Sequence, residues 1–325
     1  MAMTPESDLG SASIRSVGPK GVSHQKLFIL SLSAASFRGG FSGTLSQNTV
    51  FHQQPGTIAN PPSWFICLVR LAMASSLPAA KQQLRSLMKQ KLSKITQDSI
   101  TTQSRCIFET LKEFQPYKDA RRVSIYLAMP AAEVQTDAIV RHALSVGKQV
   151  FVPYLHKSPF QTPDTPARVM DMVHLKDVQD YESLKLDKWG IPSVDPTTVD
   201  ARIRILGGSD FQNSEPAILD FMVVPGVAFD FDQSGSIRRL GHGKGFYDFF
   251  INRYMAKLET KGMAHENPLH LYGLALTEQM VPATSELQIP TDTHDRRLNG
   301  LILGNGEIKA GVHEASVSRY PRQDL

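Results

Sequence analysis

The apolar residues of this chain recur with helical spacing in some segments and in short continuous runs in others. Over residues 81–95 they return at three- and four-residue steps, which predicts a helix with one buried face. The same spacing predicts a second helix over about residues 99–114, which Pro116 would end because proline lacks a backbone donor. A third helix is expected to begin at Thr136 and to stop at Gly147.

Short apolar runs between and after these helices predict β-strands. The runs cover residues 123–128, 150–154, 170–175, 218–224, 271–276 and 301–303, and a further helix is expected over 246–258. The run 218–224 is nearly continuous, which is typical of a central strand covered on both faces. A strand–helix–strand unit implies a right-handed crossover and parallel pairing. The alternation therefore predicts an α/β fold with three layers, α/β/α, around a mostly parallel, Rossmann-like central sheet.

Charge and composition narrow the classes of function. The 325 residues include 35 Lys+Arg and 31 Asp+Glu, a net charge of +4, and most of the excess lies in residues 1–77. The nearly neutral remainder gives no electrostatic reason to expect nucleic-acid binding. No apolar run approaches the ~20 residues that span a bilayer, so we expect no membrane helix. Two cysteines cannot form a disulfide framework, which favours a reducing compartment.

Residues 1–77 differ in composition from the rest of the chain. They are rich in Ser and Gly, and no acidic residue occurs between Leu9 and Gln97, which predicts a disordered leader before a folded domain over 78–325. A transit peptide has this composition, although Glu6 and Asp8 speak against one. The alternative is an upstream extension, with translation starting at Met73. We expect a cytoplasmic protein, or a mitochondrial one if the leader is a transit peptide.

A loop with a glycine at every second position follows the buried strand 218–224 and precedes the helix 246–258. From Arg239 to Asp248 the chain reads Arg-Leu-Gly-His-Gly-Lys-Gly-Phe-Tyr-Asp. Glycines let backbone N–H groups approach an anion, and a helix N-terminus adds partial positive charge. Arg239 and Lys244 add fixed charge, and ligands of α/β sheets gather beyond the carboxyl ends of the strands. The loop therefore predicts a phosphate site, although its spacing is neither that of a P-loop nor that of a dinucleotide fingerprint.

The same string resembles the signature of the 5-formyltetrahydrofolate cyclo-ligase (5,10-methenyltetrahydrofolate synthetase) family. That family has a Pro-Gly-x-x-Phe-Asp stretch, as in residues 225–230, followed by Arg-Leu-Gly-Arg-Gly-Lys-Gly-Tyr-Tyr-Asp. The resemblance covers residues 78 to 303 and includes the stretches 133–136, 170–173 and 189–192. It implies an enzyme that uses ATP and Mg²⁺ to convert 5-formyltetrahydrofolate into 5,10-methenyltetrahydrofolate, ADP and phosphate; we expect a monomer. The formyl oxygen would be phosphorylated and N10 would close the ring.

The resemblance also implies roles for single residues. Lys244 and Arg239 would be catalytic, and Asp248 and Asp295 would bind Mg²⁺. ATP would contact Lys81, Arg85, Arg239, Leu240, Gly241, His242, Gly243, Lys244, Gly245, Phe246 and Tyr247. The folate would contact Leu127, Glu133, His242, Gly243, Lys244, Gly245 and Phe246. Arg239 is chosen over Arg238 because it adjoins the Leu-Gly pair.

Three departures from the family pattern leave alternatives open. His242 stands where the family has Arg, Phe246 where it has Tyr, and Asn299 where it often has Asp. A first rival is therefore a non-catalytic reduced-folate-binding protein, and a second is an enzyme of sugar phosphates or coenzyme A on a similar scaffold. Taken singly, Lys81 and Arg85 could form the solvated face of a helix. Asp248 could simply favour the first turn of its helix.

Overall fold

The computed structural model describes residues 14–15, 29–30, 63–159, 166–207, 218–263, 268–283 and 287–312. The chain divides into two units, Met1–Ile66 and Cys67–Leu325. In the first unit, β1 (Ile14–Arg15) and β2 (Ile29–Leu30) pair antiparallel. The second unit carries the sheet and the candidate site.

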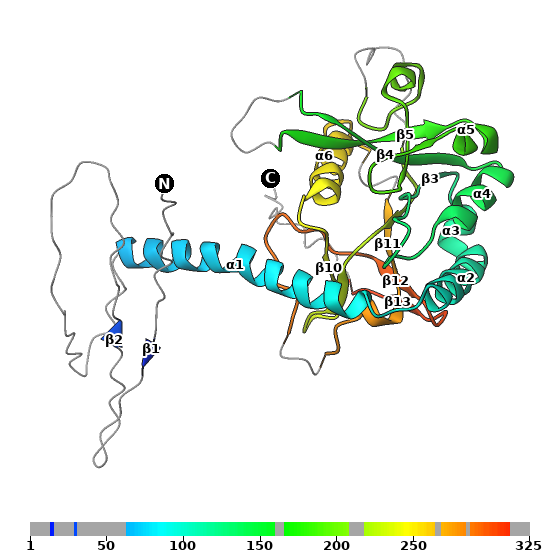
Figure 1. Ribbon diagram of the computed structural model, residues 1–325. Helices are drawn as coiled ribbons and strands as arrows, with labels where there is room; N and C mark the ends of the chain where they lie inside the picture. The colour runs from blue at the N-terminus through cyan, green and yellow to red at the C-terminus, as the bar shows by residue number, and fades with distance from the viewer. Residues whose placement is uncertain are drawn as a thin grey trace, which may run out of the picture. The chain divides into compact units, whose positions relative to one another are not determined.

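A seven-stranded sheet with the order β13-β12-β11-β8-β3-β4-β5 forms the centre of the second unit (Figure 1). Its strands are β3 (Arg122–Ser124), β4 (Gln149–Lys157), β5 (Arg168–Leu175), β8 (Phe221–Val224), β11 (His270–Ala275), β12 (Gly300–Leu303) and β13 (Ile308–Ala310). The five inner strands run parallel, and β5 and β13 are antiparallel strands at the two edges. Two hairpins lie outside the sheet: β6 (Lys185–Leu186) with β7 (Pro192–Ser193), and β9 (Ala228–Phe231) with β10 (Ile237–Leu240).

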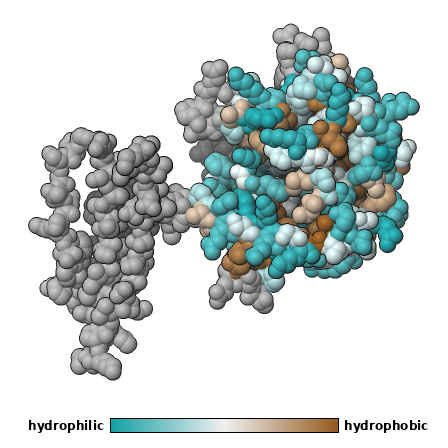
Figure 2. Space-filling view, in the orientation of Figure 1, coloured by the Kyte–Doolittle hydropathy of each residue, from teal (hydrophilic) through white to brown (hydrophobic). Residues whose placement is uncertain are grey.

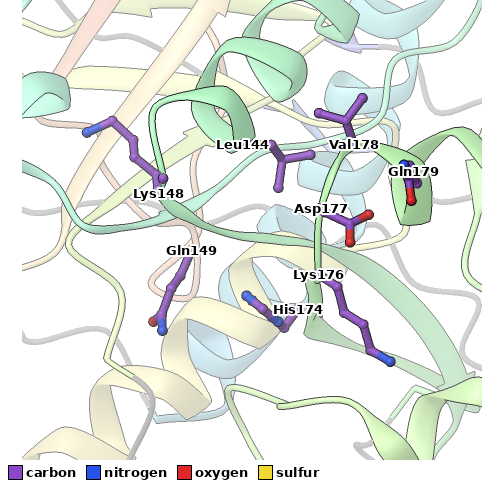
Figure 3. A pocket seen from close by; sticks show the side chains of 9 residues that line it. Leu144, Lys148, Gln149, His174, Lys176, Asp177, Val178 and Gln179 are labelled. Carbon is purple, nitrogen blue, oxygen red and sulfur yellow. The ribbon is translucent and has the colours of Figure 1, made fainter.

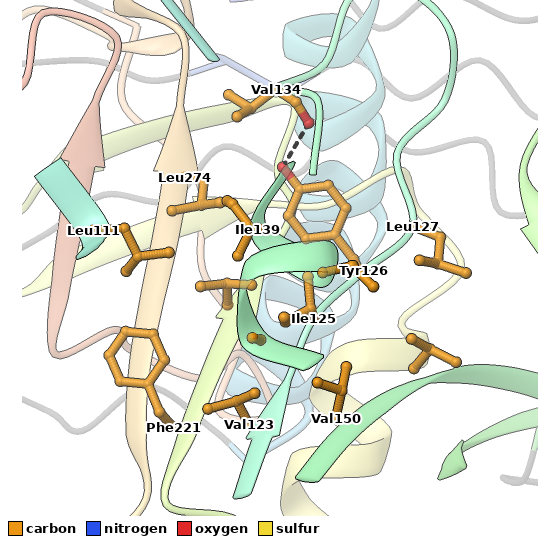
Figure 4. Packing of buried hydrophobic residues seen from close by; sticks show 14 of the residues in the cluster. Leu111, Val123, Ile125, Tyr126, Leu127, Val134, Ile139, Val150, Phe221 and Leu274 are labelled. Atoms are coloured by element: carbon orange, nitrogen blue, oxygen red, sulfur yellow. Dashed lines mark hydrogen bonds between the residues drawn. The ribbon is translucent and has the colours of Figure 1, made fainter. Parts of the chain in front are cut away.

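Helices cover both faces of the sheet. The α-helices of the described residues are α1 (Ser63–Leu92), α2 (Gln97–Glu113), α3 (Gln115–Asp119), α4 (Asp137–Ser145), α5 (Val178–Glu182) and α6 (Phe246–Thr260). One buried cluster joins α2 and α4 to Val123, Val150 and Phe221, as Figure 4 shows. A second joins α6 to Phe151 and Met222. Because neighbouring residues of a strand point to opposite faces, the predicted three-layer α/β/α architecture is confirmed.

The order of connection marks one position at the carboxyl edge of the sheet. The chain enters at β3, moves outward through β4 and β5, and then returns to β8 on the other side of β3. Strands β3 and β8 are therefore neighbours, and the chain connects β3 to strands on one side of the sheet and β8 to strands on the other side. Such a switch point is where open α/β sheets bind ligands. Residues 125–133 follow β3, and Pro225–Gly226 follow β8, so these segments flank it.

The elements differ from the predictions mainly at their ends. Pro116 does not merely end α2 but lies in the first turn of α3, where a missing N–H costs no helical hydrogen bond. The predicted strand 123–128 is shorter in the structure: β3 ends at Ser124, and the N–H of Ile125 makes one further bond to the carbonyl of Phe151. The hairpin β9–β10 was not predicted, because its second strand reads Ile-Arg-Arg-Leu and its arginines hide the strand pattern.

Most of the predicted leader lies outside the described residues, so its disorder stays a prediction, as does the domain boundary. Helix α1 begins at Ser63, inside that segment, and continues through Pro78 to Leu92. Among the described helices, none is both long enough and apolar enough to cross a bilayer.

Candidate functional site

The hairpin β9–β10 leads the chain into the glycine-rich loop and from there into α6. Residues 241–245 form the loop between β10 and α6. Gly243 has φ +97° and Gly245 φ +66°, a left-handed backbone that favours glycine. A Cβ on Gly243 would also lie 3.2 Å from Cζ of Arg85. Both observations explain why glycines recur here. Because glycines have no side chains, the loop backbone stays uncovered beside the N-terminus of α6.

The two adjacent arginines of β10 have different partners. Arg239 donates from Nη2 to Oδ2 of Asp248 at 2.7 Å and from Nη1 to the carbonyl of Pro225 at 3.2 Å. Arg238 forms a buried two-point pair with Asp230, at 2.7 and 2.6 Å. Arg239 therefore lies at the switch point and Arg238 inside the hairpin, which supports the choice of Arg239.

Helix α1 brings two more cations to the loop. Lys81 Nζ lies 2.6 Å from Oδ2 of Asp295, with only 16% of the lysine side chain exposed. One turn later, Arg85 Nε donates to the carbonyl of Gly241 at 2.8 Å. Burial lowers the pKa of Arg85, while the charge of Asp295 opposes that shift. The pair is therefore not a solvated helix face but faces the loop and its acidic neighbours.

A hydrogen bond from the backbone brings Asp248 close to Asp295. Asp248 Oδ1 accepts from the N–H of Arg296 at 3.1 Å, and Arg296 directly follows Asp295. Each carboxylate is also paired with a cation, Asp248 with Arg239 and Asp295 with Lys81. Within the described ranges, no group of three or more His, Cys, Asp or Glu side chains could hold a metal ion. Since Mg²⁺ commonly takes one or two carboxylates plus phosphate oxygens and water, this donor set fits Mg²⁺ that arrives with a nucleotide.

Glu133 lies on the other side of the switch point, in the segment after β3. It is 5% exposed, and its Oε2 accepts from the N–H of Met129 at 2.9 Å. Its Oε1 lies 3.9 Å from Nε2 of His242, so the glycine-rich loop and the Glu133 segment meet here. The pKa values of Tyr126 and Tyr247 are raised, first by burial and then by the charge of Glu133.

The remaining predicted residues differ in how exposed they are to solvent. Lys244 is exposed on the loop, and Phe246 opens α6 with a partly buried ring. Leu240 is buried with Leu84 and Met88 of α1, so its side chain packs the helix against the hairpin, and its carbonyl accepts from the N–H of Val227 at 2.7 Å. Leu127 is buried in the cluster of Figure 4.

Two glutamines of this region were not predicted as site residues. Gln279, which is buried, donates to the carbonyl of Gly226 and accepts from the N–H of Leu276. Gln135 bonds to the loop that precedes Glu133. No local sequence pattern marks Gln279, whereas Gln135 stands in the stretch 133–136, which the resemblance had already identified.

An open pocket lies at the amino ends of the parallel strands, on the side of the sheet away from the candidate site (Figure 3). It is lined by residues at the end of α4, the start of β4 and the end of β5: Leu144, Gly147, Lys148, Gln149, His174, Lys176, Asp177, Val178 and Gln179. The start of β4 is the amino end of a parallel strand, so this pocket is not part of the candidate site.

Comparisons with known proteins agree with the motif. A "Probable 5-formyltetrahydrofolate cyclo-ligase" of Schizosaccharomyces pombe is 31% identical over 223 residues, which cover 68% of this chain and 94% of that protein. The Caenorhabditis elegans protein of the same name is 31% identical over 228 residues, 70% of this chain and 94% of its own length. A "5-formyltetrahydrofolate cyclo-ligase, mitochondrial" of Arabidopsis thaliana is 26% identical over 238 residues, 70% of this chain and 75% of that protein. The family model "5-formyltetrahydrofolate cyclo-ligase family" matches residues 78–304, the span over which cations, glycine loop and carboxylates converge, and the chain therefore belongs to this family of enzymes.

Proposed function

We propose that this chain converts 5-formyltetrahydrofolate into 5,10-methenyltetrahydrofolate with consumption of ATP. The observation that carries the proposal is the convergence of Arg85, Arg239 and the glycine-rich loop on one side of the switch point, with Glu133 on the other. A phosphate-binding half thus faces a half suited to a neutral, hydrogen-bonding ring system. Such a pairing is what a reaction between a nucleotide and a folate requires.

The chemistry follows from the poor leaving ability of the formyl oxygen. Transfer of the γ-phosphoryl group from ATP to that oxygen yields ADP and an iminium ion whose formyl carbon carries the phosphorylated oxygen. N10 then attacks that carbon and loses its proton, and the C–O bond breaks with departure of phosphate. Phosphoryl transfer depends mainly on positioning and on neutralising charge. Fixed cations and backbone N–H groups provide both without reorganising during the reaction.

Each residue has a distinct part in this scheme. Lys244 and the N–H groups of residues 241–245 contact the transferred and leaving phosphates, and Lys81 and Arg85 contact the nucleotide from α1. Arg239 neutralises the charge that develops as phosphate is transferred. Tyr247 and Phe246 line the start of α6 beside the nucleotide. Their local geometry supports these parts, because the glycines leave the loop backbone uncovered and α6 points its N-terminus at the loop.

Asp248 and Asp295 would hold Mg²⁺, which neutralises phosphate charge when bound. Both carboxylates would supply oxygen ligands, and phosphate oxygens and water would complete the coordination. Lys81 and Arg239, which pair with Asp295 and Asp248, would add positive charge beside the same phosphates.

Glu133 would accept hydrogen bonds from the pterin ring. Its Oε2 is already used by Met129, whereas Oε1 faces His242 across the site. A carboxylate accepts two donors in a plane, which matches adjacent N–H groups of a pterin. Leu127, which is buried in the core cluster, would contact the folate through its apolar side chain.

The decisive experiment is an assay of the purified full chain with 5-formyltetrahydrofolate, with ATP and Mg²⁺ each left out in turn. We expect methenyl product and ADP in equal amounts, and no product in either omission. Folate binding without ADP would favour the non-catalytic rival. A preference for sugar phosphates or coenzyme A would favour the second rival.

Substitution of Lys244 tests the glycine-rich loop directly. Lys244→Ala should lower kcat at least about tenfold, since loss of one fixed donor to a developing charge commonly costs this much or more. The matched control is Lys94→Ala, an exposed lysine in the turn after α1. Full activity of Lys244→Ala would exclude the loop assignment.

The compartment depends on residues 1–77. We propose a cytoplasmic protein, with a mitochondrial location as the alternative if this segment is a transit peptide. N-terminal sequencing of the native protein, combined with cell fractionation, distinguishes the two.

A further inference from the structure

We propose that Gln135 is a positioning residue, which fixes the loop 129–133 and thereby aims the Glu133 carboxylate at the folate. This inference rests on the proposed role of Glu133 in binding the pterin. It concerns a residue that touches neither substrate, and it explains how a surface loop holds a buried carboxylate in one orientation.

The backbone on both sides of Gln135 is firmly anchored. Tyr126 donates from its hydroxyl to the carbonyl of Val134 at 3.1 Å, as the dashed line in Figure 4 shows. Thr136 donates from Oγ1 to the carbonyl of Tyr126 at 2.6 Å. The N–H of Gln135 itself donates to Oγ of Ser104 in α2 at 2.9 Å. Val134 and Thr136 are both buried, so Gln135 projects from a segment with little freedom to move.

From this anchor the side-chain amide closes the preceding loop. Nε2 of Gln135 donates to the carbonyl of Met129 and to the carbonyl of Glu133, both at 2.9 Å. An amide nitrogen has two N–H groups, so both are used on the loop. Met129 in turn donates its N–H to Oε2 of Glu133 at 2.9 Å. The amide, Met129 and Glu133 thus form a closed ring of hydrogen bonds.

The loop inside this ring is strained. Ala132 has φ +61°, and it is the one residue other than glycine with positive φ in the described chain. A side chain with a Cβ rarely adopts this conformation, so surrounding bonds must hold it. With Oε2 of Glu133 tied to Met129, Oε1 is left facing the glycine-rich loop. Without the amide of Gln135, nothing else in these contacts ties the carbonyls of Met129 and Glu133 together.

Gln135→Met tests the proposal, because it keeps the length of the side chain and removes both donors. We expect the Kd of 5-formyltetrahydrofolate, measured by calorimetry without ATP, to rise about tenfold, as loss of two modest hydrogen bonds predicts. KM for the folate should rise in parallel, while KM for ATP stays within about twofold of the wild-type value. Gln115→Met, which removes an exposed glutamine–Asp119 bond in α3, is the matched control and should change neither constant.

The outcomes separate this inference from the proposed function. An unchanged folate Kd in Gln135→Met, together with weakened binding in Glu133→Gln, would refute the positioning role and leave the function intact. Unchanged Kd values in both variants would refute the positioning role of Gln135 and also the proposed role of Glu133 in binding the pterin. An equal rise of both KM values would mean a general loss of structure and would also overturn the proposal. Urea unfolding of each variant identifies that case.

Discussion

At the scale of single residues, neighbouring side chains with the same charge occupy different environments. Arg238 lies beside buried Asp230, which also accepts from the N–H of Ile289 at 2.8 Å. Arg239 pairs with Asp248, whose side chain is 20% exposed and has a second donor in Arg296. Removal of Arg238 therefore leaves the buried carboxylate of Asp230 without a cation. Removal of Arg239 leaves the carboxylate of Asp248, which water and a backbone N–H can still solvate.

This contrast predicts separate effects on stability and turnover. Arg238→Met should lower the free energy of unfolding by about 3 kcal/mol, as for one partner of a buried ion pair. Arg239→Met should cost less stability but reduce kcat at least about tenfold, as for loss of a group that neutralises transition-state charge. Urea unfolding and steady-state kinetics on both variants check this. Near-normal kcat in Arg239→Met would show that Arg239 only supports the loop.

The residues of the candidate site could be predicted to different degrees. Arg239, Lys244 and Asp248 lie in one contiguous motif, whereas Lys81, Arg85 and Asp295 were identified only through the family resemblance. Composition alone could not show that Lys81 and Asp295 form a pair, because 214 positions separate them. The role of Gln135 depends on two backbone carbonyls, which leave no trace in the sequence.

At the scale of elements, the turn between β10 and α6 needs glycine for two separable reasons. At Gly243 a side chain would meet both a positive φ and the guanidinium of Arg85. Gly262, just after α6, has φ +69° but no atom within 4 Å of an added Cβ. The two positions therefore share the backbone strain and differ only in the contact with Arg85.

Alanine substitutions at these glycines separate strain from function. Both Gly243→Ala and Gly262→Ala should lower the free energy of unfolding by about 1 kcal/mol, the cost of a left-handed residue with a Cβ. Only Gly243→Ala should also raise KM for ATP several-fold, because it displaces Arg85. Calorimetric binding of a non-hydrolysable ATP analogue gives an independent measure. Equal nucleotide affinity in both variants would contradict a nucleotide role for Arg85.

The elements themselves were predictable where local periodicity decides the structure. Helix α4 begins after Thr136 and is followed by Gly147 with φ +76°, as its sequence indicates. The β9–β10 hairpin was not predictable, because its strands contain the Asp230–Arg238 pair. Buried charges that neutralise each other across a hairpin look like surface residues when each is read alone.

At the scale of the whole molecule, three histidines affect how stability varies with pH. Burial is the first cause that lowers the pKa of His142, His156 and His174 below the usual 6.5. The unfolded chain therefore binds protons at these positions before the folded chain does. Since stability rises with pH wherever the unfolded state binds more protons, these histidines stabilise the fold above 6.5 and destabilise it progressively below.

Urea unfolding at a series of pH values from 7 to about 5 tests this sign. We expect the wild-type midpoint to fall across this range. A chain with His142, His156 and His174 all changed to Gln should show a shallower slope. His294→Gln, at an exposed position, serves as the control. A slope that is identical in the triple variant would mean that other groups account for the dependence.

The two edges of the central sheet differ in length, and each limits association with further strands. β13 has three residues, too few for an extended ladder. β5 has eight, but the N–H of His174 donates to the carbonyl of Ile203, and Ile205 donates to the carbonyl of Met172. The outer backbone of β5 is thus already paired near its carboxyl end, and the opposite edge is short. We therefore expect both edges to disfavour the addition of a strand from another molecule, which is the first step toward fibrous aggregation.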